Sequence, residues 1–288
     1  MAGVEIRTTQ LPSGRSVPVL GQGTWRIGED RSRRESEISS LRLGMDLGMT
    51  LIDTAEMYAE GGAEEVVGEA IKDRAREEVF IVTKVYPHNA TRRGVIEACT
   101  RSLGRLQAEY IDLYLLHWRG SEPLSETLEG FEFLKANGSI REYGVSNFDV
   151  SDMEEAYVLP GGDQIATNQV LYNLMHRGIE WDLLSWCRER QIPTMAYSPI
   201  GIDSTEQKRV FGNATIKKIA SNYNLTPAQI ALAWILRHPD VIAIPKASRP
   251  EHIRDNRSAL DITLTAQDFK ELDQAFPSPD RKTPLETS

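Results

Sequence analysis

The chain has 288 residues, a length that suits either two small domains or one barrel of eight βα units. Its 42 acidic and 33 basic residues give a formal net charge of -9, which disfavours non-specific binding to nucleic acid or anionic membranes. The first ten residues lack the apolar core of a signal peptide, and no run approaches the roughly 18 apolar residues of a membrane helix. We therefore expect a cytoplasmic protein with no nucleic-acid or membrane partner.

The first predicted element is a β-hairpin near the N-terminus. Residues 5–8 and 17–20 are strand-like, and they flank the turn-forming sequence Pro12-Ser-Gly14. We expect this hairpin to cap the bottom of a barrel ahead of its first strand.

Seven strand-like runs follow, and each ends close to a polar residue. These polar residues are Asp53, Lys84, His117, Asn147, Gln169, Ser198 and Lys246. They are 31, 33, 30, 22, 29 and 48 positions apart, and most of these intervals fit one βα unit of about 30 residues. Apolar residues at helical spacing occupy residues 34–48, 92–106, 124–136, 179–190 and 226–237. Strands that alternate with helices predict a parallel sheet.

A last, weaker unit completes the predicted fold. Residues 250–256 favour a short helix, residues 258–262 an eighth strand, and residues 265–275 a closing helix. The pattern predicts an α/β protein, a (β/α)8 TIM barrel with the hairpin at its bottom, as a single domain over residues 1–288. Residues 277–288 are charged and rich in proline, so we expect an extended C-terminal tail there.

Several common motifs are absent from the sequence. The two cysteines, Cys99 and Cys187, are far apart and form neither a disulfide framework nor a CxxC motif. The five histidines include no HExxH pair, and no GxGxxG or GxxxxGK[ST] sequence follows a strand. We therefore expect no metal site, and a bound nucleotide would not use a Rossmann or P-loop motif.

Four side chains near the ends of three successive strands indicate carbonyl chemistry. Asp53, Tyr58, Lys84 and His117 would converge, because the carboxyl ends of barrel strands meet on one face. An ammonium of Lys84 within about 4–6 Å of the Tyr58 hydroxyl would lower the pKa of the phenol, and Asp53 would hold Lys84 in place. His117 would hydrogen-bond a substrate carbonyl oxygen and leave proton donation to Tyr58. Each residue alone has an ordinary structural explanation, but the set favours an active site.

A second group of polar residues follows on later strands. Ser146, Asn147 and Gln169 offer amide and hydroxyl groups, and Tyr197 offers a flat aromatic face. These groups suit a nicotinamide, whose carboxamide would be hydrogen-bonded while its ring stacks on Tyr197.

A cationic sequence ends the seventh strand. Lys246, Ser248 and Arg249 supply two cations and a hydroxyl just before a short helix, a combination suited to a phosphate group. A solvated charged surface is the ordinary alternative for such a run.

Read together, these residues resemble the aldo-keto reductase family over essentially the whole chain. The matching segments are Asp53-Thr-Ala-Glu-Met-Tyr58, Val82-Thr-Lys84, Leu115-Leu-His117-Trp118, Gly144-Val-Ser-Asn-Phe148, Asn168-Gln169-Val-Leu-Tyr172, Tyr197-Ser-Pro199 and Ile244-Pro-Lys246. The resemblance implies a (β/α)8 barrel that binds NADPH in an extended form, with Asp53, Tyr58, Lys84 and His117 as the catalytic residues.

The resemblance also implies further cofactor and substrate contacts. The cofactor-binding residues would be Gly23, Thr24, Trp25, Ser146, Asn147, Gln169 and Tyr197 at the nicotinamide, Ser198, Pro199, Ile200 and Gly201 along the pyrophosphate, Lys246, Ser248 and Arg249 at the 2′-phosphate, and Asp255 and Asn256 near adenine. The substrate would contact Trp25, Tyr58, His117 and Trp118.

The sequence departs from the family pattern in a few places. His252 lies where many members have a second phosphate-binding arginine, and Ala247 lies where serine is frequent. The short segment after Tyr197 resembles compact bacterial members, which include methylglyoxal and diketogluconate reductases. Arg119 follows Trp118 where proline is common, and we hypothesise that it favours small oxygenated or anionic carbonyl substrates, with a solvated surface arginine as the alternative.

The expected function is NADPH-dependent reduction of aldehydes, α-dicarbonyls or keto sugars to alcohols, with NADP+ as the oxidised product and Tyr58 as general acid. The partner is then a small-molecule carbonyl, and we expect a monomer. One alternative is a nucleotide-sensing regulatory subunit with slow or no turnover. Another is a Schiff-base aldolase that uses Lys84, although a lysine paired with Asp53 is a poor nucleophile.

Overall fold

The computed structural model describes residues 6–287. Eight strands form one parallel sheet in the order β10-β9-β8-β7-β6-β5-β4-β3. The strands are β3 (Gln22–Gly23), β4 (Leu51–Asp53), β5 (Phe80–Val85), β6 (Ile111–Leu116), β7 (Ile140–Ser146), β8 (Asn168–Leu171), β9 (Thr194–Tyr197) and β10 (Val241–Ala243).

Parallel bridges close this sheet into a barrel. Leu20 pairs with Ala243, and Gly23 pairs with Lys246, so the two edge strands meet. The Gly23 N–H also donates to the carbonyl oxygen of Pro245 at 3.1 Å. A Cβ at Gly23 would lie only 2.8 Å from the Ile244 carbonyl oxygen, so glycine is needed for this close approach.

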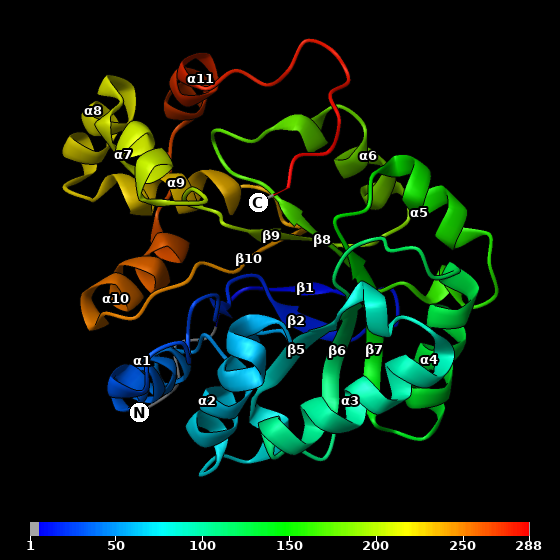
Figure 1. The fold of residues 1–288 in the computed structure, drawn as a ribbon. Coiled ribbons are helices and arrows are strands. Elements are labelled where there is room, and N and C mark those ends of the chain that lie inside the picture. Colours follow the sequence, from blue (N-terminus) through cyan, green and yellow to red (C-terminus); the bar gives the residue numbers. More distant parts are fainter. Residues whose placement is uncertain (1–5, 288) are drawn as a thin grey trace.

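Helices surround the strands, as Figure 1 shows. They are α1 (Arg34–Asp46), α2 (Gly62–Ile71), α3 (Arg92–Leu106), α4 (Leu124–Ala136), α5 (Val150–Tyr157), α6 (Leu183–Glu189), α7 (Ser204–Gly212), α8 (Ala214–Tyr223), α9 (Pro227–Ile235), α10 (Pro250–Ser258) and α11 (Ala266–Ala275). Short 3-10 turns occupy Arg31–Arg33, Tyr58–Gly61, Arg76–Glu78, Pro87–Asn89, Gly162–Gln164, Gly178–Glu180 and Ala259–Asp261. The (β/α)8 TIM barrel predicted from the sequence is confirmed. Within residues 6–287, no helix is long and apolar enough to cross a lipid bilayer.

The long interval between the ends of β9 and β10 contains two helices that the sequence analysis missed, α7 and α8. The Asp203 side chain caps α7 by accepting the N–H groups of Thr205 and Glu206. Asn213 likewise caps α8 by accepting the N–H groups of Thr215 and Ile216. Both capping residues were visible in the sequence, so α7 and α8 could have been predicted from them.

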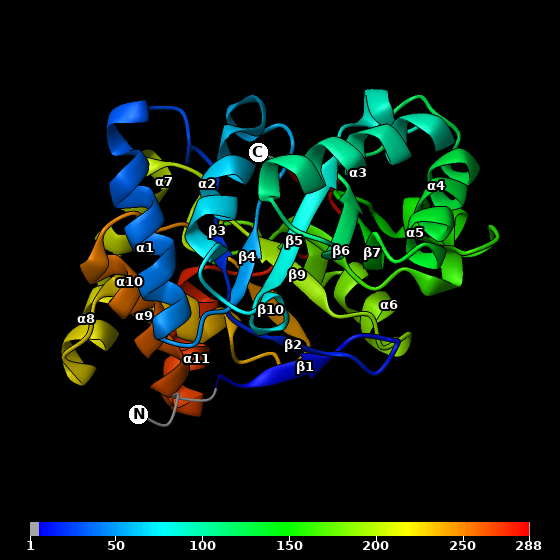
Figure 2. The same cartoon turned by 90° about the horizontal axis from the view of Figure 1, so that it is seen from below.

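The predicted N-terminal hairpin is present as β1 (Thr8–Gln10) and β2 (Ser16–Pro18), which pair antiparallel. Its predicted first residue, at position 5, lies outside the described residues. Leu11 and Val17 pack into the barrel interior with residues of the parallel strands, including Leu51 and Leu113. Figure 2 shows the hairpin at one end of the barrel and the C-terminus toward the opposite end.

Ion pairs with the buried Asp112 fix the hairpin to the barrel. Asp112, near the start of β6, pairs with Arg15 of the hairpin and with Arg76 before β5. Its Oδ2 also accepts the Ile81 N–H at 2.8 Å, so the carboxylate is fully hydrogen-bonded although it is buried. This end of the barrel is closed, and the carboxyl ends of the strands remain for a functional site.

The predicted eighth strand at residues 258–262 is wrong. Helix α10 continues through Ser258, and the 3-10 turn Ala259–Asp261 follows it. The ion pair between Arg257 and Asp261, one helical turn apart, supports this coiled conformation. The position beside β10 is taken by the segment at Leu20 and by β3, a strand of two residues that supplies the true first strand of the barrel.

Candidate active site

The four side chains predicted to carry out the chemistry lie together at the carboxyl end of the barrel. Asp53 ends β4, Lys84 is the residue before the end of β5, and His117 directly follows β6. Tyr58 begins the 3-10 turn after β4. Parallel pairing of β4, β5 and β6 explains why these ends meet.

Lys84 is the centre of this cluster. Its buried Nζ donates hydrogen bonds to Asp53 Oδ1 at 2.7 Å, to the Thr54 carbonyl oxygen at 2.8 Å and to the Tyr58 hydroxyl at 3.2 Å. These bonds use all three N–H groups of an ammonium. Burial lowers the pKa of Lys84, but the Asp53 carboxylate and the Tyr58 hydroxyl outweigh burial and raise that pKa above its ordinary value. The amine therefore stays protonated, which disfavours the aldolase alternative.

The acidity of Tyr58, the predicted general acid, differs from the prediction. Burial raises the pKa of Tyr58 more than Lys84 lowers it, and the Asp53 charge raises the pKa further. The predicted net lowering of this pKa is therefore wrong, because desolvation of the phenolate outweighs the nearby ammonium. As a result, Tyr58 holds its proton throughout the neutral range.

His117 is neutral in this environment. Burial and, to a smaller extent, the Lys84 charge together lower the pKa of His117 to about 2. The His117 ring lies beside Tyr58, with 5.8 Å between the ring centroids. Within residues 6–287, no group makes a hydrogen bond to its buried Nδ1. A neutral imidazole can donate one hydrogen bond to a carbonyl oxygen without competing with Tyr58 for the proton.

Aromatic rings form the wall around Tyr58 and His117. Trp25 lies edge-on to Tyr58 with 5.0 Å between centroids, and Trp118 lies 4.8 Å from His117. Both tryptophans are unusually exposed for their size, at 45% and 37%, which is consistent with surfaces that cover a ligand. Beside Trp25, the Thr24 N–H and hydroxyl both donate to the Asp53 carbonyl oxygen, at 3.0 and 2.9 Å.

Two further aromatic residues of this wall were missed by the sequence analysis. Tyr86 lies edge-on to Trp118 at 5.8 Å and packs on His88 at 4.6 Å. Tyr86 is two residues beyond Lys84, so its place at the exit of the same strand was a usable signal.

The polar residues predicted to bind a carboxamide lie in the same network. The Ser146 hydroxyl donates to the Gln169 carbonyl oxygen at 2.8 Å, and Gln169 Nε2 donates to Asp53 Oδ2 at 2.7 Å. Asn147 Nδ2 donates to the His117 carbonyl oxygen at 3.1 Å, and Asn147 Oδ1 accepts from the Tyr197 hydroxyl at 2.9 Å. Asp53 therefore joins Lys84 to the residues predicted to bind the carboxamide, because one of its oxygens accepts from Lys84 and the other accepts from Gln169.

Strained backbone is concentrated next to these residues. Five of the non-glycine residues with positive φ flank or belong to the site: Arg26 (64°), Ala59 (50°), Glu60 (54°), Asn147 (59°) and Ser198 (48°). Left-handed backbone costs such residues free energy, so its concentration here supports a functional arrangement of the loops.

The segment predicted to follow the pyrophosphate leaves β9 as a tight turn. The Gly201 N–H donates to the Ser198 carbonyl oxygen at 3.0 Å, and Gly201 has a φ of 112°, which favours glycine. Pro199 is buried and Ile200 is half-buried within this turn.

The cationic group predicted to bind a phosphate lies beside the barrel closure. Lys246 pairs with Gly23, and its Nζ donates to Ser248 Oγ at 3.4 Å. Partial desolvation lowers the pKa of Lys246, and the charges of Arg33 and Arg26 lower it further. These two arginines were missed by the sequence analysis, although both lie in the charged stretch after Trp25.

The remaining predicted cofactor residues lie on or next to α10. Arg249 is exposed at the N-terminus of α10, Asp255 is half-buried and Asn256 is buried in its last turn. His252 is exposed on the same helix.

Arg119 forms an ion pair with a neighbouring helix through one of its guanidinium nitrogens. Its guanidinium pairs with Glu155 of α5 at 2.9 Å. The charge is thus partly neutralised, which weakens the hypothesis that Arg119 selects anionic carbonyls.

This fold and this cluster define a barrel enzyme of the oxidoreductase class. The family model described as "Aldo/keto reductase family" matches residues 19–276. The chain belongs to the aldo/keto reductase family.

Individual relatives agree with this assignment over nearly their whole length. The chain is 51% identical over 271 residues to methylglyoxal reductase YeaE of Escherichia coli, covering 94% of this chain and 95% of the relative. It is 33% identical to a glyoxal reductase of Bacillus subtilis, covering 92% and 91%. A crystal structure of an aldo/keto reductase from Klebsiella pneumoniae in complex with NADP and acetate superposes with a TM-score of 0.95 at 47% identity, covering 98% of this chain and 100% of that one.

Proposed function

We propose that this protein reduces aldehydes, α-dicarbonyls or keto sugars to alcohols with NADPH, and that Tyr58 is the general acid. The observation that carries the proposal is the contact of a protonated, Asp53-bound Lys84 with the Tyr58 hydroxyl at 3.2 Å. Support also comes from relatives named as methylglyoxal and glyoxal reductases and from a similar structure with bound NADP.

The donor set of the barrel mouth fits NADPH at both ends of the molecule. Ser146, Asn147 and Gln169 offer amide and hydroxyl groups for the carboxamide, and Tyr197 offers a half-buried ring beside them. At the other end, Lys246 with Arg249, and Arg26 with Arg33, supply cations for phosphate groups. When bound, NADPH supplies the hydride that adds to the carbonyl carbon.

The proton chemistry follows from the protonation states of the cluster. Neutral His117 donates a hydrogen bond to the substrate carbonyl oxygen and polarises it. As negative charge develops on that oxygen, Tyr58 transfers its proton, and the adjacent Lys84 ammonium stabilises the resulting phenolate. Asp53 keeps Lys84 charged and in place, and solvent returns a proton to Tyr58 after the alcohol leaves.

The aromatic wall indicates the size of the substrate. Trp25 and His117 lie edge-on to the Tyr58 ring, Trp118 lies beside His117, and Tyr86 lies edge-on to Trp118. We propose that such a wall suits small, uncharged carbonyl compounds, of which methylglyoxal is the simplest test.

The proposal is tested by following NADPH absorbance with the purified protein. Methylglyoxal, an aromatic aldehyde and a keto sugar are supplied in turn, with NADH as the matched cofactor control. Rapid, repeated turnover with NADPH on at least one carbonyl is the expected result. Tight NADPH binding without turnover on any of them would instead favour the nucleotide-sensing subunit.

A further inference from the structure

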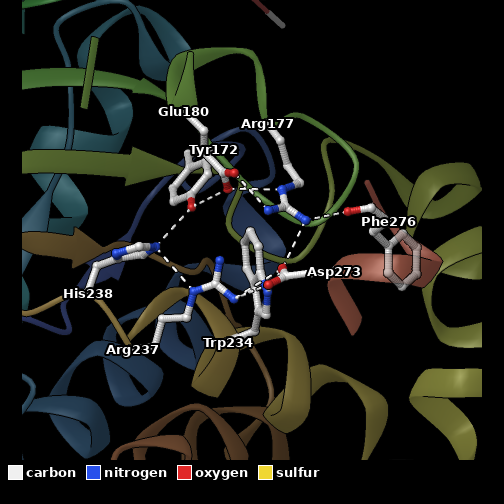
Figure 3. A network of polar contacts seen from close by, with 8 residues as sticks. All are labelled: Tyr172, Arg177, Glu180, Trp234, Arg237, His238, Asp273 and Phe276. Atoms are coloured by element: carbon white, nitrogen blue, oxygen red, sulfur yellow. Dashed lines mark hydrogen bonds and ion pairs between the residues drawn. The ribbon is translucent and has the colours of Figure 1, made fainter. Parts of the chain in front are cut away.

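The C-terminal region after α10 is attached to the barrel by a polar network shown in Figure 3. Arg177 donates to the Phe276 carbonyl oxygen and pairs with Asp273 of α11 at 3.0 Å. Asp273 also pairs with Arg237 at 3.1 Å and accepts from Trp234 Nε1 at 3.1 Å. This network fixes α11 and therefore the point from which residues 277–287 start.

Residues 277–287 form neither helix nor strand, and they return along the segment that follows β8. Lys282 pairs with Asp182 at 2.9 Å, and Glu286 Oε1 lies 3.0 Å from His176 Nδ1. We call residues 277–287 the C-terminal tail. The ion pair nearest to the end of the C-terminal tail is the one between Glu286 and His176.

The turn that contains His176 also holds the segment after β9. Asn173 Nδ2 donates to the Ser198 carbonyl oxygen at 2.9 Å. His176 Nε2 lies 2.7 Å from Glu206 Oε1, and Glu206 Oε2 accepts the Ile202 N–H at 2.9 Å. Residues 198–206 are thus tied to the same turn that binds the C-terminal tail.

The side chain of His176 contacts both segments. It lies between two carboxylates, Glu206 on α7 and Glu286 on the C-terminal tail, and only 16% of its side chain is exposed. The contact with Glu206 is a hydrogen bond, whereas the contact with Glu286 is an ion pair that is not aligned as a hydrogen bond. Burial lowers the pKa of His176, but the two carboxylates outweigh it and raise the pKa overall. A charged imidazolium is the form that satisfies both carboxylates at once.

We propose that His176 is a positioning residue that couples docking of the C-terminal tail to closure of residues 198–206 over the cofactor. The coupling rests on the proposed function, in which residues 198–201 follow the pyrophosphate. Loss of the Glu286 contact leaves Glu206 as the sole carboxylate on His176, and the hold on the Ile202 N–H weakens. While its contact with His176 is intact, the C-terminal tail therefore slows the release of NADPH or NADP+, although it touches neither.

The first test needs no cofactor. Hydrogen exchange of residues 198–206 is compared in the full-length protein, in Glu286→Gln and in Asp280→Asn. Glu286 is 45% exposed, so its amide variant keeps the fold, and Asp280→Asn removes an equal charge from the same tail. Within residues 6–287, no ion pair involves Asp280, which makes it the matched control. We expect faster exchange in residues 198–206 for Glu286→Gln only, and equal exchange in the two variants would overturn the coupling.

The second test measures NADPH release by stopped-flow fluorescence. Glu286→Gln and His176→Gln should each release NADPH at least about fivefold faster, the lower end of typical coupling between sites. The double variant should release it no faster than His176→Gln, because both changes break one pathway. The KM for methylglyoxal should not change. An unaltered rate of NADPH release in Glu286→Gln would contradict the coupling. Failure of the wild-type protein to bind NADPH would instead contradict the proposed function, and the hydrogen-exchange result would then decide the coupling.

Discussion

The buried ion pair between Asp53 and Lys84 gives the most detailed prediction. Replacing Asp53 by Asn keeps the shape of the side chain but removes the charge that offsets Lys84. The ammonium would then remain buried with only the Thr54 carbonyl oxygen, the Tyr58 hydroxyl and a neutral amide as acceptors. Breaking one partner of a buried pair typically costs about 3–5 kcal/mol, so we expect that loss in the free energy of unfolding at neutral pH.

A double-mutant cycle separates the pair from its parts. Lys84→Met should also be destabilising, because Asp53 would keep only its hydrogen bond from Gln169 as a charge-assisted contact. The double variant Asp53→Asn with Lys84→Met should be less destabilised than the sum of the single variants, since it leaves no buried charge. Unfolding in urea at several pH values provides the free energies.

The pH dependence of the Asp53→Asn variant has a definite sign. Without the carboxylate, burial depresses the pKa of Lys84 in the folded state below the unfolded value of about 10.4. The loss in the free energy of unfolding is therefore complete at pH values below the pKa of Lys84 in the folded state. The loss disappears as the pH rises through the pKa of this lysine in the unfolded state. A loss below about 1 kcal/mol at neutral pH, or a loss that grows at alkaline pH, would refute this electrostatic reasoning.

Three further predictions follow from individual contacts. Because the pKa of Tyr58 is raised and the pKa of His117 is lowered to about 2, the single-turnover rate of reduction should be constant between about pH 5 and 9; an inflection near pH 6.5 would indicate a titrating His117 instead. Lys246→Ala should weaken NADPH binding by about ten- to hundredfold more than NADH binding in fluorescence titrations, and equal weakening would mean that the 2′-phosphate binds elsewhere. Asp112→Asn should cost about 3–5 kcal/mol in urea unfolding with unchanged KM values, because it leaves Arg76 without its buried carboxylate, and a changed KM would contradict a purely structural role.

The strand pattern made most of the fold predictable. Strands β4, β5 and β6 are mostly apolar, and Asp53, Lys84 and His117 lie at or next to their ends, so these exits were visible in the sequence. The eighth strand was misassigned because β3 is only two residues long and carries no periodic pattern. Its role depends on the bridge between its own Gly23 and Lys246 across the barrel closure, which no local pattern records.

The residue types of the site were predictable from the sequence, but the pKa values of its side chains were not. The pKa of Tyr58 depends on how completely its hydroxyl is buried, and burial is a property of the folded barrel. The contributions of Tyr86 and Arg26 also depend on proximity, although each follows a predicted site residue closely in the chain. The contact of His176 with Glu286 joins positions more than a hundred residues apart, so the sequence offered no signal for it.

Proton transfer from Tyr58 is the central claim, and one substitution tests it most directly. Tyr58→Phe removes the hydroxyl that Lys84 contacts, while Tyr157→Phe on α5, where the ring packs on Trp186, is the control for the same chemical change. The measurement is the single-turnover rate of methylglyoxal reduction with saturating NADPH. We predict a loss on the order of 10²–10⁴ for Tyr58→Phe with unchanged NADPH affinity, and no loss for Tyr157→Phe. Equal rates in the two variants would contradict the assignment of Tyr58 as the general acid.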